Sequence, residues 1–463
     1  MAVLLFVLLF ADGVCGSAPG FIGSALREVA AIFRDPGTQW MIFLCLGVYF
    51  TVFLFLRSRI AAGFWRATTP NLWLAGALLI SAVLYAIGYS PSLDALTLLA
   101  GALLGQGLAV WVGFNANKPS QPSTSSFPLL LVSLLVILLA LASVWNVGSG
   151  YSFEYRGHAR WSGPWDNPNL YGLLMGVGTV LAAGLIISGV RCQVSGENDG
   201  KKRTWKLRNG KHLKWLLVMV CLFAAILMGR ALLHSYCRGA WLAAICGLAY
   251  LFWSSVQSPK PKGQGHWIYW LKKNWLPFSV TLASAFALSV WQFQHTEHEN
   301  MVARRAFSVG NVNDFSWRNR LAYWEGALQI MAEKPWFGFG WNQPGPIYDQ
   351  YYRTPKVVES RAIQLNDYLM LGATLGIPAL FCFGMYLWLS LARKAGGGNQ
   401  KSKITELDSL QATCRAGAIV LLVGFWFDGG LFKLPTAMTF WILLELGSVE
   451  LPQKAAKQTN EVF

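Results

Sequence analysis

Charged side chains are scarce in this sequence. Asp, Glu, Lys and Arg supply 13% of its 463 residues, whereas hydrophobic residues supply 54%. Soluble domains average about 25% charged residues, so the composition excludes an ordinary soluble protein. Apolar runs of membrane-spanning length recur along the chain, without a repeat of fixed period and without an ATP-binding motif. We therefore predict a polytopic α-helical membrane protein.

Cysteine pairs and metal-ligand spacing are also absent. The eight cysteines are scattered, most of them inside apolar runs, and the sequence contains no CxxC pair and no Cys/His cluster with zinc-ligand spacing. We interpret the cysteines as small buried hydrophobic residues. We expect neither a metal site nor a cofactor.

Acidic residues are outnumbered by basic ones, which gives a net charge of +16. In a membrane protein, excess Lys and Arg marks the cytoplasmic loops. Nucleic acid is excluded as a partner because the chain has no soluble basic domain to bind it. Attraction to anionic membrane lipids or to a diphosphate group remains open.

The basic loops orient about twelve predicted spans, with both ends of the chain in the cytoplasm. The run at 2–10 lacks a basic flank, so we predict a short first span there, not a cleaved signal. The predicted spans are 2–10, 40–56, 71–89, 93–114, 127–146, 170–190, 215–233, 240–257, 274–294, 367–392, 411–428 and 434–448, with a surface helix over 21–33.

The predicted fold is an all-α membrane bundle with a large outer loop that contains surface helices. It divides into an N-terminal bundle of about nine spans (1–294), the outer loop region (295–365), and the C-terminal spans with a cytoplasmic tail (366–463). Long loops in compact proteins usually carry function, so the candidate site is expected at this loop.

The outer loop contains a predicted amphipathic helix that ends before Pro335. An apolar stripe at helical spacing predicts that this helix lies on the membrane surface. A re-entrant helix whose arginines extend to the interface is the alternative. The stripe consists of Trp317, Leu321, Trp324, Leu328 and Met331, and Arg320 shares the face of Trp324.

Arginines gather at the outer ends of the predicted spans. Arg230, His234 and Arg238 are spaced by four and line one face if the helix continues through them. A guanidinium group in an outer cavity suits phosphate oxygens bidentately. The alternative is that Arg230 only extends to the interface and Arg238 only caps the loop.

Two further clusters join this outer face. Arg156 and Arg160 precede an Asn-rich segment, whose asparagines act either as turn and cap residues or in sugar binding. Acids, amides and arginines at the start of the span at 367–392 suit diphosphate chemistry through charge neutralisation, or else form surface ion pairs. The second cluster consists of Arg318, Arg320, Glu359, Arg361, Gln364, Asn366 and Asp367.

Four motifs make the chain resemble the O-antigen ligase and polymerase family of bacterial inner-membrane proteins, over roughly residues 150–390. Their order and loop placement are specific, although each motif alone is weak. They are Gly163-Pro164-Trp165-Asp166-Asn167-Pro168-Asn169; Cys237-Arg238-Gly239-Ala240; Arg320-x-x-x-Trp324 with Pro335-Trp336-Phe337-Gly338-Phe339-Gly340; and Asn366-Asp367-Tyr368-Leu369 with Leu375-Gly376-Ile377.

The resemblance implies a periplasmic active site on a multi-pass protein of the inner membrane. Such a protein transfers a glycan from undecaprenyl diphosphate to a hydroxyl group of an acceptor, often the lipid A core. The matching positions imply that Arg238 and Arg320 hold the diphosphate and stabilise the leaving group. Arg156, Arg160, Arg230, His234, Arg318, Arg361 and Asn366 are the expected substrate-binding residues.

One position departs from the family pattern. The family usually has a His before the Asn of the fourth motif, as the proposed general base, and here that position is Leu365. Glu359, Asp367 and His234 are the candidates to replace it. General-base catalysis is typically worth a factor of about 10²–10⁴, so its loss does not by itself abolish transfer. A polymerase of the same family, a flippase or transporter of lipid-linked sugars, and a non-catalytic homologue remain the alternatives.

Overall fold

The computed structural model describes residues 73–74, 76, 93–116, 127–144, 152–155, 158–165, 167–197, 208–257, 315–353, 366–392 and 406–448. The predicted spans at 2–10, 40–56 and 274–294, most of the span at 71–89, and the surface helix at 21–33 lie outside these residues.

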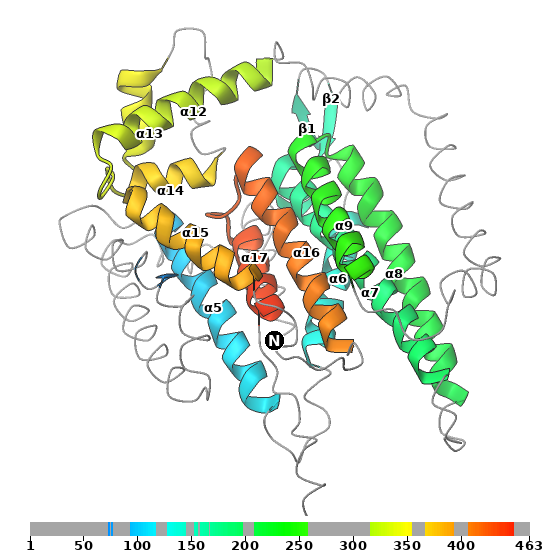
Figure 1. Cartoon of the computed structure of the whole chain (residues 1–463). Helices are drawn as coiled ribbons and strands as arrows, with labels where there is room; N and C mark the ends of the chain where they lie inside the picture. The colour runs from blue at the N-terminus through cyan, green and yellow to red at the C-terminus, as the bar shows by residue number, and fades with distance from the viewer. Residues whose placement is uncertain are drawn as a thin grey trace, which may run out of the picture.

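The described residues form a helical bundle, as predicted (Figure 1). α16 and α17 lie at its centre, with α6 to α9 on one side and α5 and α15 on the other. The helices are α5 (Leu93–Ala116), α6 (Phe127–Val144), α7 (Pro168–Glu197), α8 (Arg208–His234), α9 (Arg238–Gln257), α12 (Phe315–Glu333), α13 (Pro344–Ile347), α14 (Asp367–Leu375), α15 (Ile377–Ala392), α16 (Glu406–Phe427) and α17 (Leu434–Ser448).

The described residues also contain two short strands and two short helical turns. β1 (Ser152–Tyr155) and β2 (His158–Trp161) form an antiparallel hairpin, followed by the short helix η2 (Gly163–Trp165). The π-helical turn η5 (Tyr348–Tyr352) follows α13. The hairpin stands at the end of the bundle where α8 and α9 meet, and α12 lies across the neighbouring part of the same end (Figure 1). We refer to this end as the loop end.

Two described helices are long and apolar enough to cross a membrane, over Pro168–Ser188 in α7 and Ser409–Phe427 in α16. Shorter apolar helices cover Pro128–Val144, Val218–His234 and Ile377–Ala392. These helices agree with the predicted spans in that part of the chain. The total of about twelve spans stays a prediction.

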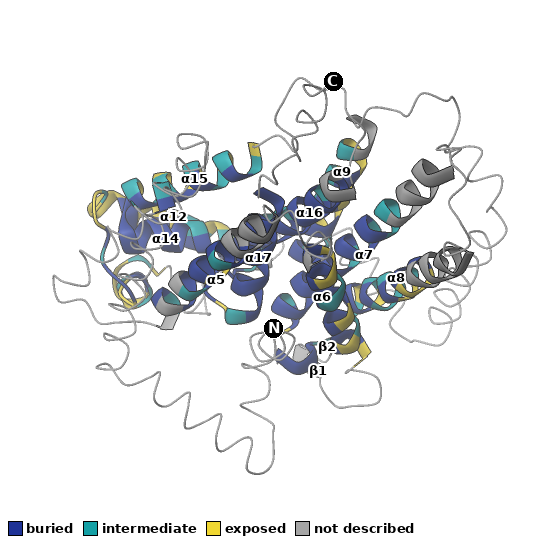
Figure 2. Ribbon diagram, turned by 90° about the horizontal axis from the view of Figure 1, so that it is seen from below, coloured by how far each residue is buried: buried dark blue, intermediate teal, exposed yellow. Residues whose placement is uncertain are grey.

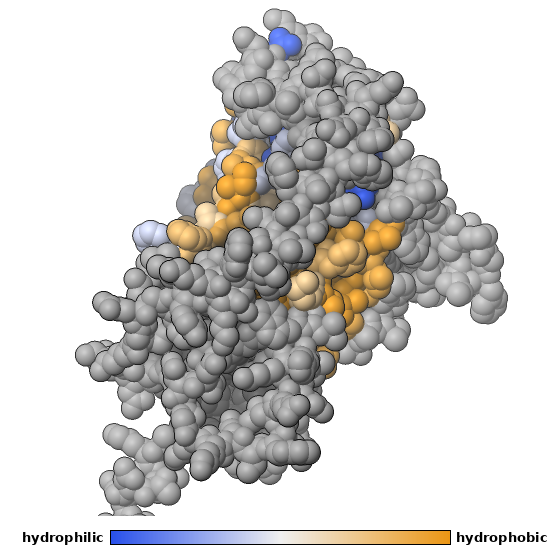
Figure 3. Space-filling view, turned by 90° about the vertical axis from the view of Figure 1, so that its right-hand side faces the viewer, coloured by the Kyte–Doolittle hydropathy of each residue, from blue (hydrophilic) through white to orange (hydrophobic). Residues whose placement is uncertain are grey.

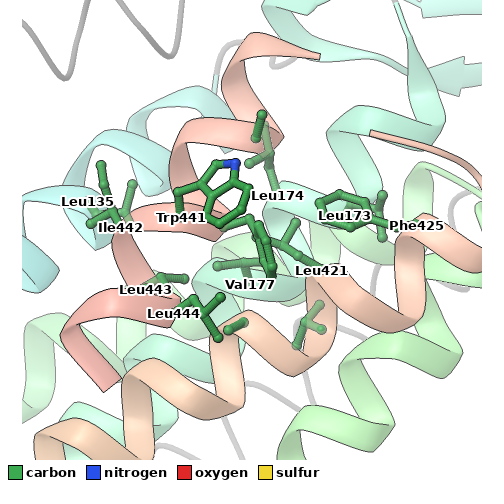
Figure 4. Packing of buried hydrophobic residues seen from close by; sticks show 14 of the residues in the cluster. Leu135, Leu173, Leu174, Val177, Leu421, Phe425, Trp441, Ile442, Leu443 and Leu444 are labelled. Atoms are coloured by element: carbon green, nitrogen blue, oxygen red, sulfur yellow. The ribbon is translucent and has the colours of Figure 1, made fainter. Parts of the chain in front are cut away.

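The core is built from α6, α7, α16 and α17, whose apolar side chains interdigitate around Trp441 (Figure 4). α17 is buried from Pro435 to its last residue, Ser448, and it appears dark blue at the centre of Figure 2. The outer helices expose apolar side chains, among them Phe223 on α8 and Phe252 on α9. In Figure 3 the described residues on the face toward α8 and α9 are mostly hydrophobic. A helix that is apolar on its outer side is expected where lipid replaces water.

A buried polar contact joins three helices inside the bundle. Gln106 of α5 donates a hydrogen bond to the Tyr386 hydroxyl of α15 at 3.2 Å and another to the Glu445 carboxylate of α17. Tyr386 also donates to Glu445. Hydrogen bonds away from water fix the register of these helices, because leaving the same groups unpaired costs free energy.

One predicted span requires correction, and one open condition is settled. The predicted span at 367–392 is broken at Gly376, where φ is +86°, into the short helix α14 and the apolar helix α15. The condition under which Arg230, His234 and Arg238 would line one helix face is not met, because α8 ends at His234 and Arg238 begins α9 after a turn in which Tyr236 has φ +49°. Both interruptions require backbone conformations that helical periodicity does not report.

The apolar stripe predicted on α12 is divided between exposed positions and contacts with neighbouring helices, and its place on the membrane surface stays a prediction. Leu321 and Leu328 are exposed, whereas Tyr323, Ala327 and Ile330 pack on Leu369 and Ala373 of α14. Trp317 and Trp324 contact α16 through Phe427 and Trp426. Two adjacent faces of α12 are therefore occupied, one by α14 and one by the end of α16.

Candidate functional site

An ion pair at the loop end of the bundle joins two segments that are distant in the sequence. The Nη2 atom of Arg320, on α12, lies 2.9 Å from Oδ1 of Asp428, in the turn after α16. The Asp428 side chain is 2% exposed and that of Arg320 is 11% exposed. A shielded charge requires a partner, so each group fixes the position of the other.

The turn between α8 and α9 contacts the same carboxylate. The Cys237 thiol donates a hydrogen bond to Oδ2 of Asp428 at 3.0 Å. Burial raises the pKa of this thiol well above its usual value, and the neighbouring Asp428 carboxylate raises the pKa further. The thiol therefore stays protonated and acts as a donor.

Arg238 begins α9 between two residues that touch Asp428. Cys237 precedes it, and a Cβ atom built on the following residue, Gly239, would lie 2.0 Å from Oδ2 of Asp428. Only a residue without a side chain permits this approach. The Arg238 backbone thus lies beside the ion pair of Arg320, and its half-buried side chain starts from that point. The two arginines that the sequence singled out belong to one neighbourhood.

Arg160 supports this neighbourhood from the hairpin. Its Nε atom donates to the Ser235 carbonyl at 2.9 Å, and its Nη2 atom donates to Oδ1 of Asn169 at 2.8 Å. Arg160 therefore ties β2 and the start of α7 to the turn that holds Cys237. These contacts show that Arg160 positions the segments around it, whereas substrate binding by Arg160 stays a prediction.

The first residues of α14 organise the neighbouring turn. Oδ2 of Asp367 accepts a hydrogen bond from the Leu431 N–H at 2.6 Å, in the turn that also contains Asp428. Asn366 caps α14, since its Oδ1 accepts from the N–H groups of Tyr368 and Leu369. Asp367 is 2% exposed. Its carboxylate is thus committed to the backbone, and its role as general base stays a prediction.

Among the described residues, two buried donors near these turns have no hydrogen-bond acceptor. They are Nε of Arg320 and Nδ2 of Asn366. Buried donors are normally satisfied by protein, water or ligand. Both donors therefore still require an acceptor, which water, a ligand or another part of the chain would have to supply.

Arg230 and His234 form a separate group with Trp161. The Arg230 guanidinium lies 5.3 Å from the centre of the Trp161 ring, and His234 stacks on the same ring at 4.5 Å. Arg230 is exposed, as is Arg318 on α12. The structure places these residues at the loop end, where Trp161 of the hairpin holds Arg230 and His234 together.

An apolar groove lies next to the ion pair. It is a shallow depression, widely open to the surroundings, with a volume of about 470 Å³, and it is lined by Tyr368, Leu387, Leu422, Val423, Trp426 and Phe427, from α14, α15 and α16. Phe427 immediately precedes Asp428 in the chain. The charged site and the apolar groove therefore adjoin at the end of α16.

Three predicted site residues lie outside the described part of the chain, namely Arg156, Glu359 and Arg361, as does Leu365, which stands where the family has its His. Conversely, Asp428 was not among the predicted site residues. The available signal was a lone carboxylate between two apolar spans, followed by two glycines. Within the described part of the chain, no three His, Cys, Asp or Glu side chains lie together as metal ligands.

Comparison with known proteins agrees with the resemblance seen in the motifs. Residues 223–384 match the family model described as O-antigen ligase. A curated relative, the general O-oligosaccharyltransferase of Acinetobacter baylyi, is 22% identical over 366 residues, which are 74% of this chain and 54% of the relative. The chain thus spans about half the length of that relative. The matched range contains Arg238 and Arg320 but ends before Asp428.

Proposed function

We propose that this chain, whose residues 223–384 match the O-antigen ligase family model, transfers a glycan from undecaprenyl diphosphate to a hydroxyl group of an acceptor. The reaction takes place at the periplasmic face of the bacterial inner membrane. The observation that carries this proposal is the fixed arginine: Arg320 held by Asp428, which also contacts the turn that bears Arg238.

The arginines supply electrostatic stabilisation. The Nη2 atom of Arg320 donates to Asp428, and its Nε atom has no acceptor among the described residues. A guanidinium group held in one position can donate to a phosphate oxygen without being reorganised during the reaction. Arg238 supplies the second positive group. Together they bind the diphosphate and stabilise the negative charge that grows on it.

The transfer is a substitution at the anomeric carbon of the first sugar. The acceptor oxygen forms the new glycosidic bond, and the bond from the anomeric carbon to the phosphate oxygen breaks. The electron pair of that bond leaves with undecaprenyl diphosphate, and the acceptor proton passes to a base. Glu359, Asp367 and His234 are the candidate bases.

The apolar groove supports the choice of a lipid carrier. Its lining residues are aliphatic or aromatic, and it adjoins Asp428 through Phe427. A long isoprenoid chain is apolar, whereas its diphosphate end is anionic. The groove and the Arg320 neighbourhood offer these two environments side by side.

Ligase and polymerase activities share this chemistry and differ in the acceptor. The name of the relative, O-oligosaccharyltransferase, describes the transfer of an oligosaccharide to an oxygen atom. We therefore propose a ligase-like reaction, with the lipid A core or another hydroxyl-bearing molecule as acceptor. Polymerisation is the second candidate.

The test compares Arg238→Ala and Arg320→Ala in cells, with Arg353→Ala as an exposed arginine control outside the site. Both site variants are expected to lose surface glycan and to accumulate lipid-linked precursor at the periplasmic face. Precursor that accumulates on the cytoplasmic face instead would indicate a flippase. Wild-type levels of surface glycan in both variants would exclude the arginine assignment.

A further inference from the structure

Two large aromatic side chains project from the segment that follows α12. Trp336 is 71% exposed and Phe337 is 54% exposed. Aromatic residues with this degree of exposure normally mark a contact surface.

The backbone that carries these side chains is fixed against the junction of α14 and α15. The N–H groups of Phe339 and Gly340 donate to the carbonyls of Ala373 and Thr374, and Ile377 N–H donates to the Pro335 carbonyl at 2.8 Å. Since both sides of the segment are bonded to the α14–α15 junction, Trp336 and Phe337 have a defined position relative to α15.

The exposed apolar surface continues along α15. Ile377, Phe381 and Trp388 are 48%, 57% and 69% exposed, and their spacing places them on one face of the helix. Ile377 lies beside Pro335 through the hydrogen bond described above. Trp336 and Phe337 therefore extend this face beyond the first residue of α15.

The length and ends of this surface match a lipid bilayer. The 16 residues of α15 extend about 24 Å, which is less than the hydrocarbon thickness of about 30 Å. Arg393 and Lys394 follow α15 in the sequence, as expected at a cytoplasmic interface. At the opposite end, Trp336 and Phe337 supply the aromatic residues that are enriched at the other interface.

We infer that Trp336 and Phe337 insert into the interfacial region of the phospholipid bilayer and set the depth of α12. Because Arg320 is carried by α12, this contact holds the guanidinium group at a fixed level relative to the lipid headgroups. The inference concerns membrane contact alone and does not depend on the proposed reaction.

Photo-crosslinking tests this contact in the full chain. Phe337 is replaced by p-benzoyl-phenylalanine, and the purified protein is reconstituted in vesicles of phosphatidylethanolamine and phosphatidylglycerol. The same replacement at Phe381 provides a reference on α15, and replacement at Gln350, an exposed polar residue of η5, provides the control. After irradiation, mass spectrometry of the intact protein identifies any attached lipid.

The inference predicts phospholipid adducts at positions 337 and 381 and none at position 350. Elution of each variant as a single species before irradiation confirms that it has folded. A lipid adduct at position 381 without one at position 337 would overturn the inference. So would a covalent dimer at position 337, because it would identify a second copy of the chain as the partner of this surface.

Discussion

Replacement of Asp428 by Asn removes the charge that holds Arg320. The two side chains are 2% and 11% exposed and 2.9 Å apart, so water screens their attraction only weakly. Removal of one partner from a buried ion pair costs about 3–5 kcal/mol. Since Asn keeps one oxygen that can accept from Arg320, we expect a loss near the lower end, about 3 kcal/mol.

A double-mutant cycle separates this ion pair from other effects of the substitution. The free energy of unfolding is measured by SDS titration in mixed micelles for the wild type, Asp428→Asn, Arg320→Gln and the double variant. Removal of both charges leaves no unpaired charge, so the double variant is expected to be more stable than the sum of the single losses implies.

The coupling energy between Asp428 and Arg320 decides whether the ion pair stabilises the protein. Independent sites add within about 0.3–0.5 kcal/mol. A coupling energy within that limit would mean that Asp428 does not hold Arg320. Cys237→Ala serves as a reference, because it removes the other hydrogen bond to Asp428 without removing a charge.

Three further substitutions test the surroundings of the site. Gly239→Ala places a Cβ atom 2.0 Å from Oδ2 of Asp428, so we expect the free energy of unfolding to fall by about 1–3 kcal/mol and transfer to be reduced. The control is Gly229→Ala, whose Cβ atom meets nothing within 4 Å, and we expect it to be neutral or stabilising. Gly338→Ala combines φ +67° with a contact of 2.4 Å to the Thr374 carbonyl, and should lower stability by about 1–3 kcal/mol, as measured by the same titration. Asp367→Asn retains an oxygen for the Leu431 N–H, so transfer should fall less than about tenfold; a loss of about 10²–10⁴ would identify Asp367 as the base.

The helical part of the fold follows from hydropathy. The spans predicted at 93–114, 127–146, 240–257 and 434–448 agree with α5, α6, α9 and α17 within a few residues. Long apolar runs report helices well because a membrane requires every backbone group to be paired within the segment. Hydropathy did not predict the break at Gly376, because the break depends on a hydrogen bond from the Ile377 N–H to the Pro335 carbonyl, which lies far away in the sequence.

The candidate site was only partly accessible from the sequence. Motif order pointed to Arg238 and Arg320, and the basic loops placed both at the same end of the bundle. The carboxylate between them was not identified, because Asp428 follows α16 and meets Arg320 across 108 positions of the chain. Pairing at such separation depends on how the helices pack.

The most direct test of the central claim is the binding of undecaprenyl diphosphate to the purified protein in detergent. Binding is measured for the wild type, Arg238→Gln, Arg320→Gln and the exposed control Arg353→Gln, with undecaprenol as the uncharged ligand. The account predicts that both site variants lose affinity for undecaprenyl diphosphate and keep their affinity for undecaprenol. Arg353→Gln is expected to bind both ligands as the wild type does. Equal affinity of all four proteins for undecaprenyl diphosphate would contradict it.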